Sequence, residues 1–420
     1  MLKSVRMWPS IKSTICERST TAAATATVSV SDMSIADSIS TTHKPIDAQL
    51  KLLQENIMNK LVLNDSVTKS NNMIAHNTIN QWHFHNSIST SQNNKIIETP
   101  TLLVHGYAAS SMAFHLTFNK LSNGIRDLYA IDLPGNGLSE TPKLKLPTLQ
   151  THKITFNKDY SKFSMNEKND TIKELNLLKE YENYYVKKID EWREENHIEK
   201  FNIIGHSFGG YISFKYAIAY PERVEKIGLI SPLGMERNVY SLNNKFTPSE
   251  EYQVSIEDPS SIYYSRNFKV PTWLFNNQLN TLRYMGPIGG SLAKRYINRA
   301  YVRVPGTEYH DYLYHVFYKS NKFPKTTINN FTNMFTRNLL AKDPILDNLD
   351  KLKAKKVLLM YGDHDWMNGE AGYSMVKELA HSYHYKPHEQ IDFVQVPDAG
   401  HNLFLDNPEF FSDEILTFFK

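Results

Sequence analysis

The hexapeptide GHSFGG, residues 205–210, lies between an apolar stretch, FNII, and a helix-like stretch, YISFKYAIAYPERV. Its first five residues fit the pattern G-x-S-x-G, with His206 as the first variable residue. In this pattern a strand turns sharply into a helix, and side chains at Gly205 or Gly209 would collide with the flanking elements. The turn strains the serine backbone and presents its hydroxyl at a helix N-terminus, where the dipole favours a developing anion. The stretch therefore predicts a nucleophile elbow with Ser207 as the nucleophile.

A serine nucleophile needs a base, and in this arrangement the order along the chain is Ser, Asp, His. The segment FVQVPDAGH places His401 on a loop after a late strand. The segment KKVLLMYGDHD offers two acids, Asp363 and Asp365. We favour Asp365 because the turn after the strand usually has the form Gly-x-x-Asp, which leaves Asp363 to cap the turn. The acid would hold the imidazole in its useful tautomer and stabilise its charged form.

An oxyanion formed at Ser207 needs two hydrogen-bond donors. One is the backbone N–H of Phe208, the residue after the nucleophile. The other is expected in the loop LLVHGYAASS, from Tyr107 or Gly106. In the same loop we expect His105 to brace the backbone by hydrogen bonds.

Short apolar runs that end at Gly or Pro recur along the chain: TLLVHG, LYAIDLPG, FNIIGHS, EKIGLISP, KKVLLMYG and IDFVQVPDAG. Helical patterns lie between them, over residues 171–196, 209–220, 370–383 and 406–419. Buried strands that alternate with helices predict an α/β fold, with a mostly parallel sheet and helices on both faces.

The segment between ISPLG and KKVLLMYG has no strand-like apolar run and is rich in aromatic and basic residues. We interpret it as an inserted helical lid, and we expect a second, polar insert at residues 144–170 to be a surface loop. The expected domains are a leader (1–40), an N-terminal helical extension (41–78), a first core part (79–235), the lid (236–350) and a second core part (351–420).

The leader is basic, rich in Ser, Thr and Ala, and poor in acids, which is typical of a mitochondrial transit peptide. The alternative is a tail that carries no targeting information. No apolar run is long enough to cross a membrane. The single cysteine, Cys16, excludes a disulfide scaffold, and the net charge of +3 argues against a dedicated nucleic-acid binder. No familiar metal-ligand spacing is present, so we expect no metal and no cofactor.

The lid contains a basic stretch, SLAKRYINRAYVRV, with aromatic and aliphatic residues interleaved. Its cations are Lys294, Arg295, Arg299 and Arg303. A basic helix of this kind suits an anionic membrane surface, and the alternative is an ordinary solvated face over a packed core.

Taken together, LLVHG, DLPGNGLS, GHSFGG, YGDHD and AGH resemble an α/β-hydrolase-fold enzyme. More narrowly, ISPLGM, YLYHVFY, YGDHDWMNGEAG and HNLFLD resemble the lipid-acting subfamily, which includes fungal mitochondrial cardiolipin-specific deacylases and lysophosphatidic acid acyltransferases. Members share a His-x-x-x-x-Asp signature, here His401 to Asp406. Asp406 also has a structural interpretation, as the N-cap of a helix with Glu409 three residues on, close to a capping box.

The resemblance implies a serine phospholipid deacylase of phospholipase A type, which acts on cardiolipin as a peripheral protein on the matrix side of the mitochondrial inner membrane. Two alternatives remain open. A lysophosphatidic acid acyltransferase would use the same residues with acyl-CoA, and a non-enzymatic lipase co-regulator would not need Ser207. The sequence gives no indication of an oligomeric state.

Overall fold

The computed structural model describes residues 46–420, except 89–95, 168–169 and 321–322. The predicted leader, residues 1–40, and Cys16 within it therefore lie outside the described residues, and its targeting function stays a prediction from the sequence.

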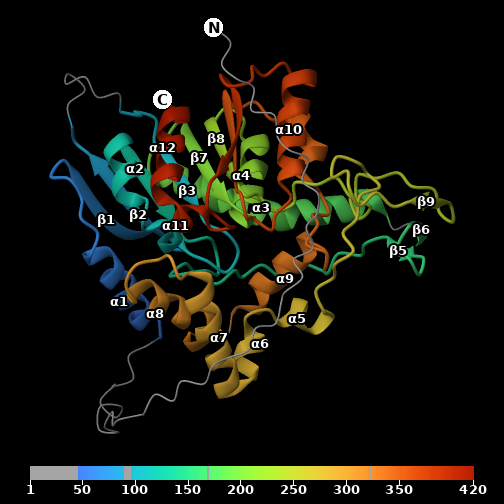
Figure 1. The fold of residues 1–420 in the computed structure, drawn as a ribbon, viewed down its shortest axis with the longest axis horizontal. Helices are drawn as coiled ribbons and strands as arrows, with labels where there is room; N and C mark the ends of the chain where they lie inside the picture. Colours follow the sequence, from blue (N-terminus) through green and yellow to red (C-terminus); the bar gives the residue numbers. More distant parts are fainter. Residues whose placement is uncertain (1–45, 89–95, 168–169, 321–322) are drawn as a thin grey trace, which may run out of the picture. The chain divides into compact units, whose positions relative to one another are not determined.

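An eight-stranded sheet forms the centre, in the order β1-β2-β4-β3-β7-β8-β10-β11 (Figure 1). Its strands are β1 (Val67–Ile74), β2 (Ile79–Asn86), β3 (Thr101–Val104), β4 (Asp127–Ile131), β7 (Phe201–His206), β8 (Val224–Ile230), β10 (Lys356–Gly362) and β11 (Ile391–Val396). The six strands from β4 to β11 in this order pair in parallel, whereas β1 and β2 are antiparallel. The predicted α/β fold with a mostly parallel sheet is confirmed.

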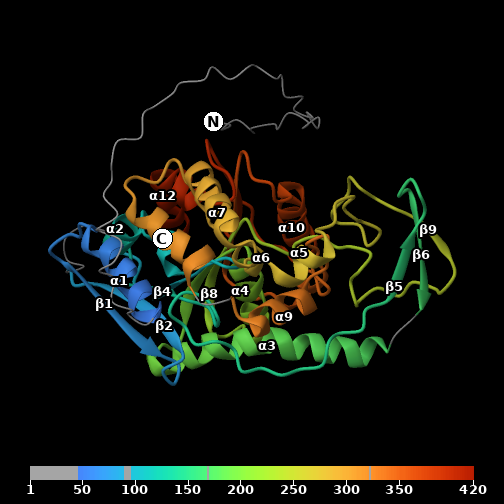
Figure 2. The ribbon, with the colours of Figure 1, turned by 90° about the horizontal axis from the view of Figure 1, so that it is seen from below.

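Successive strand residues alternate between two cores, one on each face of the sheet. In β3, Leu102 and Val104 face one core and Leu103 faces the other, as the period of two requires. The first core is covered by α3 (Thr171–Glu195), α4 (Phe208–Ala219) and α10 (Gly369–Ser382), and the second by α2 (Phe118–Gly124), α11 (Leu403–Asp406) and α12 (Pro408–Phe419). Figure 2 shows α3 as the long green helix along one face.

Capping side chains explain where the predicted helices begin. Asp170 accepts hydrogen bonds from the amides of Ile172 and Lys173 at the start of α3, both at 3.1 Å. Asn368 accepts from the amide of Glu370 at the start of α10. Each side chain satisfies amides that have no partner within the helix, which fixes the first turn.

The chain between β8 and β10 contains the segment that we interpret as the lid, residues 236–350. Its helices are α5 (Thr272–Asn277), α6 (Asn280–Tyr284), α7 (Gly286–Ala300), α8 (Glu308–Tyr314), a π-helical turn (His315–Lys319), α9 (Lys325–Met334) and a 3-10 segment (Ile345–Lys351). They are gold to orange in Figure 1, to one side of the sheet. The remaining helices are α1 (Ile46–Asn59), which contacts α8, and a 3-10 turn, Ser111–Phe114.

The second insert is not the surface loop that we expected. Its strands β5 (Lys153–Phe156) and β6 (Lys162–Glu167) form a hairpin, and β9 (Glu251–Gln253) from the lid adds to it as a third strand. Phe163 and Met165 of β6 pack against Val239 and Phe246 in a small separate core. The loop prediction was wrong because the partner strand β9 and these apolar partners come from a distant part of the chain.

The N-terminal extension is also only partly helical. Within residues 41–78, α1 is the predicted helix, but β1 pairs with β2 in the main sheet. The expected boundary between residues 78 and 79 therefore falls inside a β-hairpin.

A buried ion cluster joins three separate elements beneath the sheet. Lys215 of α4 lies 3.3 Å from Glu182 of α3 and forms a second ion pair with Asp343, which follows α9. Burial raises the pKa of Glu182 to about 7 even though Lys215 opposes that effect. Burial would lower the pKa of Lys215, but Asp343 and Glu182 raise it overall. The cluster ties the helix that follows Ser207 to the segment that returns from the lid.

We predict that Lys215→Ala lowers the free energy of unfolding by about 3–5 kcal/mol, because it leaves two carboxylates buried without a cation. Urea denaturation measures the loss. The matched control is Lys200→Ala, which removes an exposed lysine whose Nζ lies 3.7 Å from Glu225 and should cost about 0–1 kcal/mol. Equal losses in the two variants would show that the buried cluster does not stabilise the fold.

Candidate active site

Ser207 connects β7 to α4 in a strained backbone conformation. Its φ is 52° and its ψ is −116°, in a region that non-glycine residues rarely occupy. Its amide donates to Ile230 O at 2.9 Å, and its carbonyl accepts from the amides of Tyr211 at 3.1 Å and Leu233 at 3.0 Å. These bonds to the neighbouring strand and helix hold the strained turn.

The glycines of the turn are required by close backbone approaches. A Cβ on Gly205 would lie 2.4 Å from the carbonyl oxygen of Gly209. A Cβ on Gly209 would lie 2.3 Å from the carbonyl oxygen of His105, at the end of the neighbouring strand. Any side chain at either position would therefore push the helix away from the sheet.

The structure places Asp365, and not Asp363, against His401. His401 Nδ1 lies 3.1 Å from Asp365 Oδ1, and the Asp365 side chain is only 2% exposed. Asp363 instead accepts hydrogen bonds from the amides of Asp398 and Ala399, both at 2.9 Å. Asp363 therefore fixes the loop that carries the histidine, while Asp365 contacts the imidazole ring itself.

Asp365 is held in its charged form. Burial would raise the pKa of this carboxyl, but the hydrogen bond and charge of His401, the nearby hydroxyl of Ser231 and the amide of Met367 lower it overall. Met367 donates its amide at 3.0 Å. An ionised acid in this place can orient the imidazole and stabilise an imidazolium.

Ser207 and His401 line the same cavity. In the part of the chain that the structure describes, no hydrogen bond joins the Ser207 hydroxyl to the imidazole. Such bonds are often long in a ligand-free site and shorten when substrate binds.

The candidate oxyanion donors lie beside the nucleophile. A Cβ on Gly106 would be 3.1 Å from Ser207 Cβ, so the 106–107 loop runs directly next to the serine. Within the described ranges, the amides of Tyr107 and Phe208 donate to no other residue, which leaves both free for an oxyanion. The use of Tyr107 and Phe208 as oxyanion donors, with Gly106 as the alternative, stays a prediction.

His105 braces the oxyanion loop. Its Nε2 accepts from the amide of Leu133 at 2.8 Å, so its Nδ1 carries the proton and donates to Gly106 O at 2.6 Å. Burial lowers the pKa of His105, which keeps the ring neutral, although Asp132 opposes that shift. The ring thus fixes the loop position by two hydrogen bonds.

His206 does more than fill the variable position of the elbow. Its Nε2 donates to the backbone carbonyl of His401 at 2.9 Å, and the two rings lie 4.6 Å apart. Burial and repulsion by His401 lower the pKa of His206 well below its usual value, so this ring is neutral. The half-exposed Trp366 contacts the His401 ring, with ring centres 5.0 Å apart. Sequence reasoning missed both contacts because they depend on how three loops meet.

Asp406 does not cap the final helix, so the capping-box interpretation was wrong. Asn407 is the N-cap of α12 and accepts from the Phe410 amide at 3.3 Å. Asp406 instead accepts from the amide of Gly400 at 2.9 Å. The acid of the His-x-x-x-x-Asp signature therefore holds the residue immediately before His401.

A cavity of about 590 Å³ opens at Ser207 and His401. The lid supplies most of its apolar wall: Leu279, Leu282, Leu292, Ala293, Tyr296, Tyr301, Tyr309, Leu313 and Phe317. An apolar wall of this kind around a serine nucleophile suits a hydrophobic acyl chain.

Three of the four predicted basic lid residues lie on α7. Lys294, Arg295 and Arg299 are exposed there. Arg303 lies beyond the helix end and donates to the carbonyl of Asp398, in the histidine loop. The expectation of one continuous basic helix was therefore wrong at Arg303. In the described chain, no helix has the length and apolar composition needed to cross a membrane.

A family model described as alpha/beta hydrolase fold matches residues 99–408. The chain is 46% identical to 1-acylglycerol-3-phosphate O-acyltransferase ICT1 of Saccharomyces cerevisiae, over 88% of this chain and 92% of that protein. It is 42% identical to Protein ECM18 of the same yeast, over 88% of this chain and 80% of that protein. Human 1-acylglycerol-3-phosphate O-acyltransferase ABHD5 is 26% identical, over 76% of each chain.

Among solved structures, a 2-hydroxy-6-oxo-6-phenylhexa-2,4-dienoate hydrolase from a Rhodococcus species superposes with a TM-score of 0.53. The two sequences are 15% identical, and the superposition covers 84% of this chain and 99% of that chain. At this identity the similarity supports the fold alone.

We predict that Asp365→Asn slows acylation of Ser207 about 10,000-fold, because the imidazole loses the acid that fixes its tautomer. The rate of labelling by a fluorophosphonate probe measures acylation. The matched control is Asp363→Asn, which weakens only the loop contacts and should slow labelling by about tenfold or less. A larger loss in Asp363→Asn would exchange the two assignments.

Proposed function

This chain belongs to the α/β-hydrolase-fold family, and we propose that it is a serine acyltransferase that forms phosphatidic acid from acyl-CoA and 1-acylglycerol-3-phosphate. The main support is the 46% identity to a yeast protein of that name, over nearly the full length of both chains. The geometry adds a strained serine, a histidine paired with a buried acid, and an apolar cavity at both.

In the proposed first step, the Ser207 hydroxyl attacks the thioester carbonyl of acyl-CoA while His401 accepts its proton. The amides of Phe208 and Tyr107 stabilise the oxyanion. The intermediate collapses to an acyl-serine, and CoA leaves as a thiol with the proton from His401. In the second step His401 takes the proton of the free glycerol hydroxyl, which attacks the acyl-serine to give phosphatidic acid and regenerate Ser207.

Cardiolipin deacylation would use the same acyl-enzyme with water as the acceptor. The sequence alone favoured that reaction, but the named activity of the 46% identical relative supports the acyltransferase alternative better. Human ABHD5, at 26% identity, carries the same acyltransferase name. We therefore place acyl transfer to a lysophospholipid first. The mitochondrial location stays a prediction from residues 1–40.

The lid supports a lipid substrate and contact with a membrane surface. On α7 the exposed Ile288, Leu292 and Tyr296 follow one another at helical spacing. Leu292 and Tyr296 also line the cavity at Ser207. We propose that this strip and the cations beside it rest on an anionic bilayer, from which the lysophospholipid enters the cavity.

We predict that Ser207→Ala abolishes formation of phosphatidic acid from labelled acyl-CoA and 1-acylglycerol-3-phosphate, because no acyl-enzyme forms. Thin-layer chromatography of the lipids measures product. Free fatty acid from cardiolipin, with no phosphatidic acid, would instead support the deacylase. An unlabelled Ser207 after treatment with a fluorophosphonate would support the non-enzymatic regulator.

We predict that charge reversal at Lys294, Arg295 and Arg299 weakens binding to anionic phospholipid vesicles by about 100-fold or more, as measured by flotation. Each lost cation removes about 1 kcal/mol, and the new negative charges are repelled by the surface. The matched control reverses three exposed lysines of α3: Lys173, Lys179 and Lys187. Equal binding by both triple variants would contradict membrane contact through α7.

A further inference from the structure

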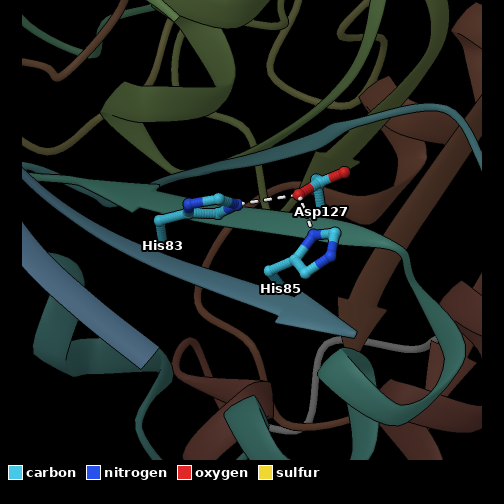
Figure 3. A group of neighbouring side chains, drawn as sticks. All are labelled: His83, His85 and Asp127. Carbon is cyan, nitrogen blue, oxygen red and sulfur yellow. Dashed lines mark hydrogen bonds and ion pairs between the residues drawn. The ribbon is translucent and has the colours of Figure 1, made fainter. Parts of the chain in front are cut away.

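Three metal-ligating side chains meet on two neighbouring strands of the main sheet. His83 and His85 are two residues apart on β2, so their side chains point to the same face. Asp127 begins β4 and is the register partner of His85, while Tyr129 is the partner of His83. Strand pairing therefore brings all three groups together, as Figure 3 shows.

Both imidazole rings point to the same carboxylate oxygen of Asp127. His83 Nε2 lies 2.9 Å and His85 Nδ1 lies 2.8 Å from Asp127 Oδ1 (Figure 3). The three donor atoms all lie within 4.8 Å of one another. Their side chains are 26%, 47% and 23% exposed, in the order His83, His85 and Asp127, so solvent reaches the group.

Packing beneath the group fixes its orientation. The His83 ring stacks on Tyr129, with centres 4.2 Å apart and planes 4° from parallel. Tyr129 in turn packs edge-on against the buried Trp192 of α3. This stacking limits rotation of the His83 ring, whereas the His85 side chain is half-exposed.

The two imidazoles also stabilise the charged form of Asp127. Burial would raise the pKa of Asp127, but its hydrogen bonds and charge interactions with the two imidazoles lower it overall. The neighbouring Arg126 is engaged by Glu98, with nitrogen–oxygen distances of 3.0 and 3.1 Å. The carboxylate is thus ionised, and the nearest fixed cation is paired elsewhere.

We propose that His83, His85 and Asp127 bind one Zn²⁺ ion, with water as the fourth ligand. Two imidazoles and a carboxylate are typical zinc ligands, at about 2.0–2.2 Å from the metal, whereas Ca²⁺ and Mg²⁺ prefer sets made of oxygen. The ion would take the place of the two imidazole–carboxylate hydrogen bonds, so each ring would bind it through the nitrogen that now faces Asp127 Oδ1 and carry its proton on the other ring nitrogen. The three donor atoms already lie close enough together, within 4.8 Å of one another, for one ion to contact them all after the side chains rotate.

The location places the ion away from the candidate active site. Asp127 is the first residue of β4, which runs parallel to β3. Ser207 and Gly106 follow the opposite, carboxyl ends of β7 and β3. A zinc ion here would cross-link β2 to β4, and so attach the antiparallel β1–β2 hairpin to the parallel sheet.

The test uses the full chain, stripped of metal with a chelator and then dialysed. We expect calorimetry with Zn²⁺ to give one tight equivalent and thermal denaturation to give a higher Tm with the ion. Co²⁺ in place of Zn²⁺ should give the visible absorption of a tetrahedral complex. Failure of the wild-type chain to bind one equivalent would overturn the proposal.

The key variant is His85→Asn, since the half-exposed side chain can be changed without disturbing the core. We expect it to weaken Zn²⁺ binding by about 100-fold or more and to remove the Tm increase. Asp127→Asn should also weaken Zn²⁺ binding and remove the Tm increase. It tests the site independently if His85→Asn fails to fold. Unchanged binding in these variants would contradict the site.

The matched control is His364→Ala, in the second group of metal-ligating side chains among the described residues, Asp363, His364 and Asp398. All three are exposed. Binding should persist in this variant. Loss of the tight equivalent in His364→Ala would assign the ion to that loop instead. Neither outcome depends on the proposed acyltransferase activity, because each is read from binding and stability alone.

Discussion

The backbone at Ser207 is the constraint on which the rest of the site depends. A serine with φ of 52° is unfavourable by itself, and it persists because β8 and α4 hold it by hydrogen bonds on both sides. The same turn brings the Phe208 amide and the Ser207 hydroxyl to the carboxyl edge of a parallel sheet. The order of strands then decides what can reach them: β3 brings the 106–107 loop, and β10 and β11 bring the acid and the histidine.

The histidine loop is held from three directions. Asp365 contacts the ring of His401, the neutral His206 holds its carbonyl, and Asp406 holds the amide of Gly400. The acid of the His-x-x-x-x-Asp signature thus acts on the backbone beside the base. Because it holds the backbone next to His401, it has a positioning role that either acyl acceptor, water or a lysophospholipid, would use. The signature by itself therefore does not choose between the two reactions.

Short-range patterns predicted much of this molecule. The six parallel strands, the helices over 171–196, 209–220 and 370–383, and the elbow are local features, and each appears where the apolar periodicity and the glycines predicted it. The predictions that were wrong needed information from elsewhere in the chain. The strand β6 forms because it pairs with β9. Asp406 accepts a hydrogen bond from the Gly400 amide, and Asn407 caps α12 in its place. The cluster of His83, His85 and Asp127 exists only through strand register, so no spacing along the sequence reveals it.

The lid segment is hydrogen-bonded directly to the loops of the candidate active site. Tyr107 donates to Gln278, Tyr312 donates to Ser110 at 2.8 Å, and Arg303 donates to Asp398 O. Lifting the lid would break these bonds and release the oxyanion loop from its position. An enzyme built this way would lose its ability to stabilise the tetrahedral intermediate whenever bulk water can enter freely. Opening of the lid, which would let lipids enter and leave, would therefore also slow hydrolysis of the acyl-serine by water.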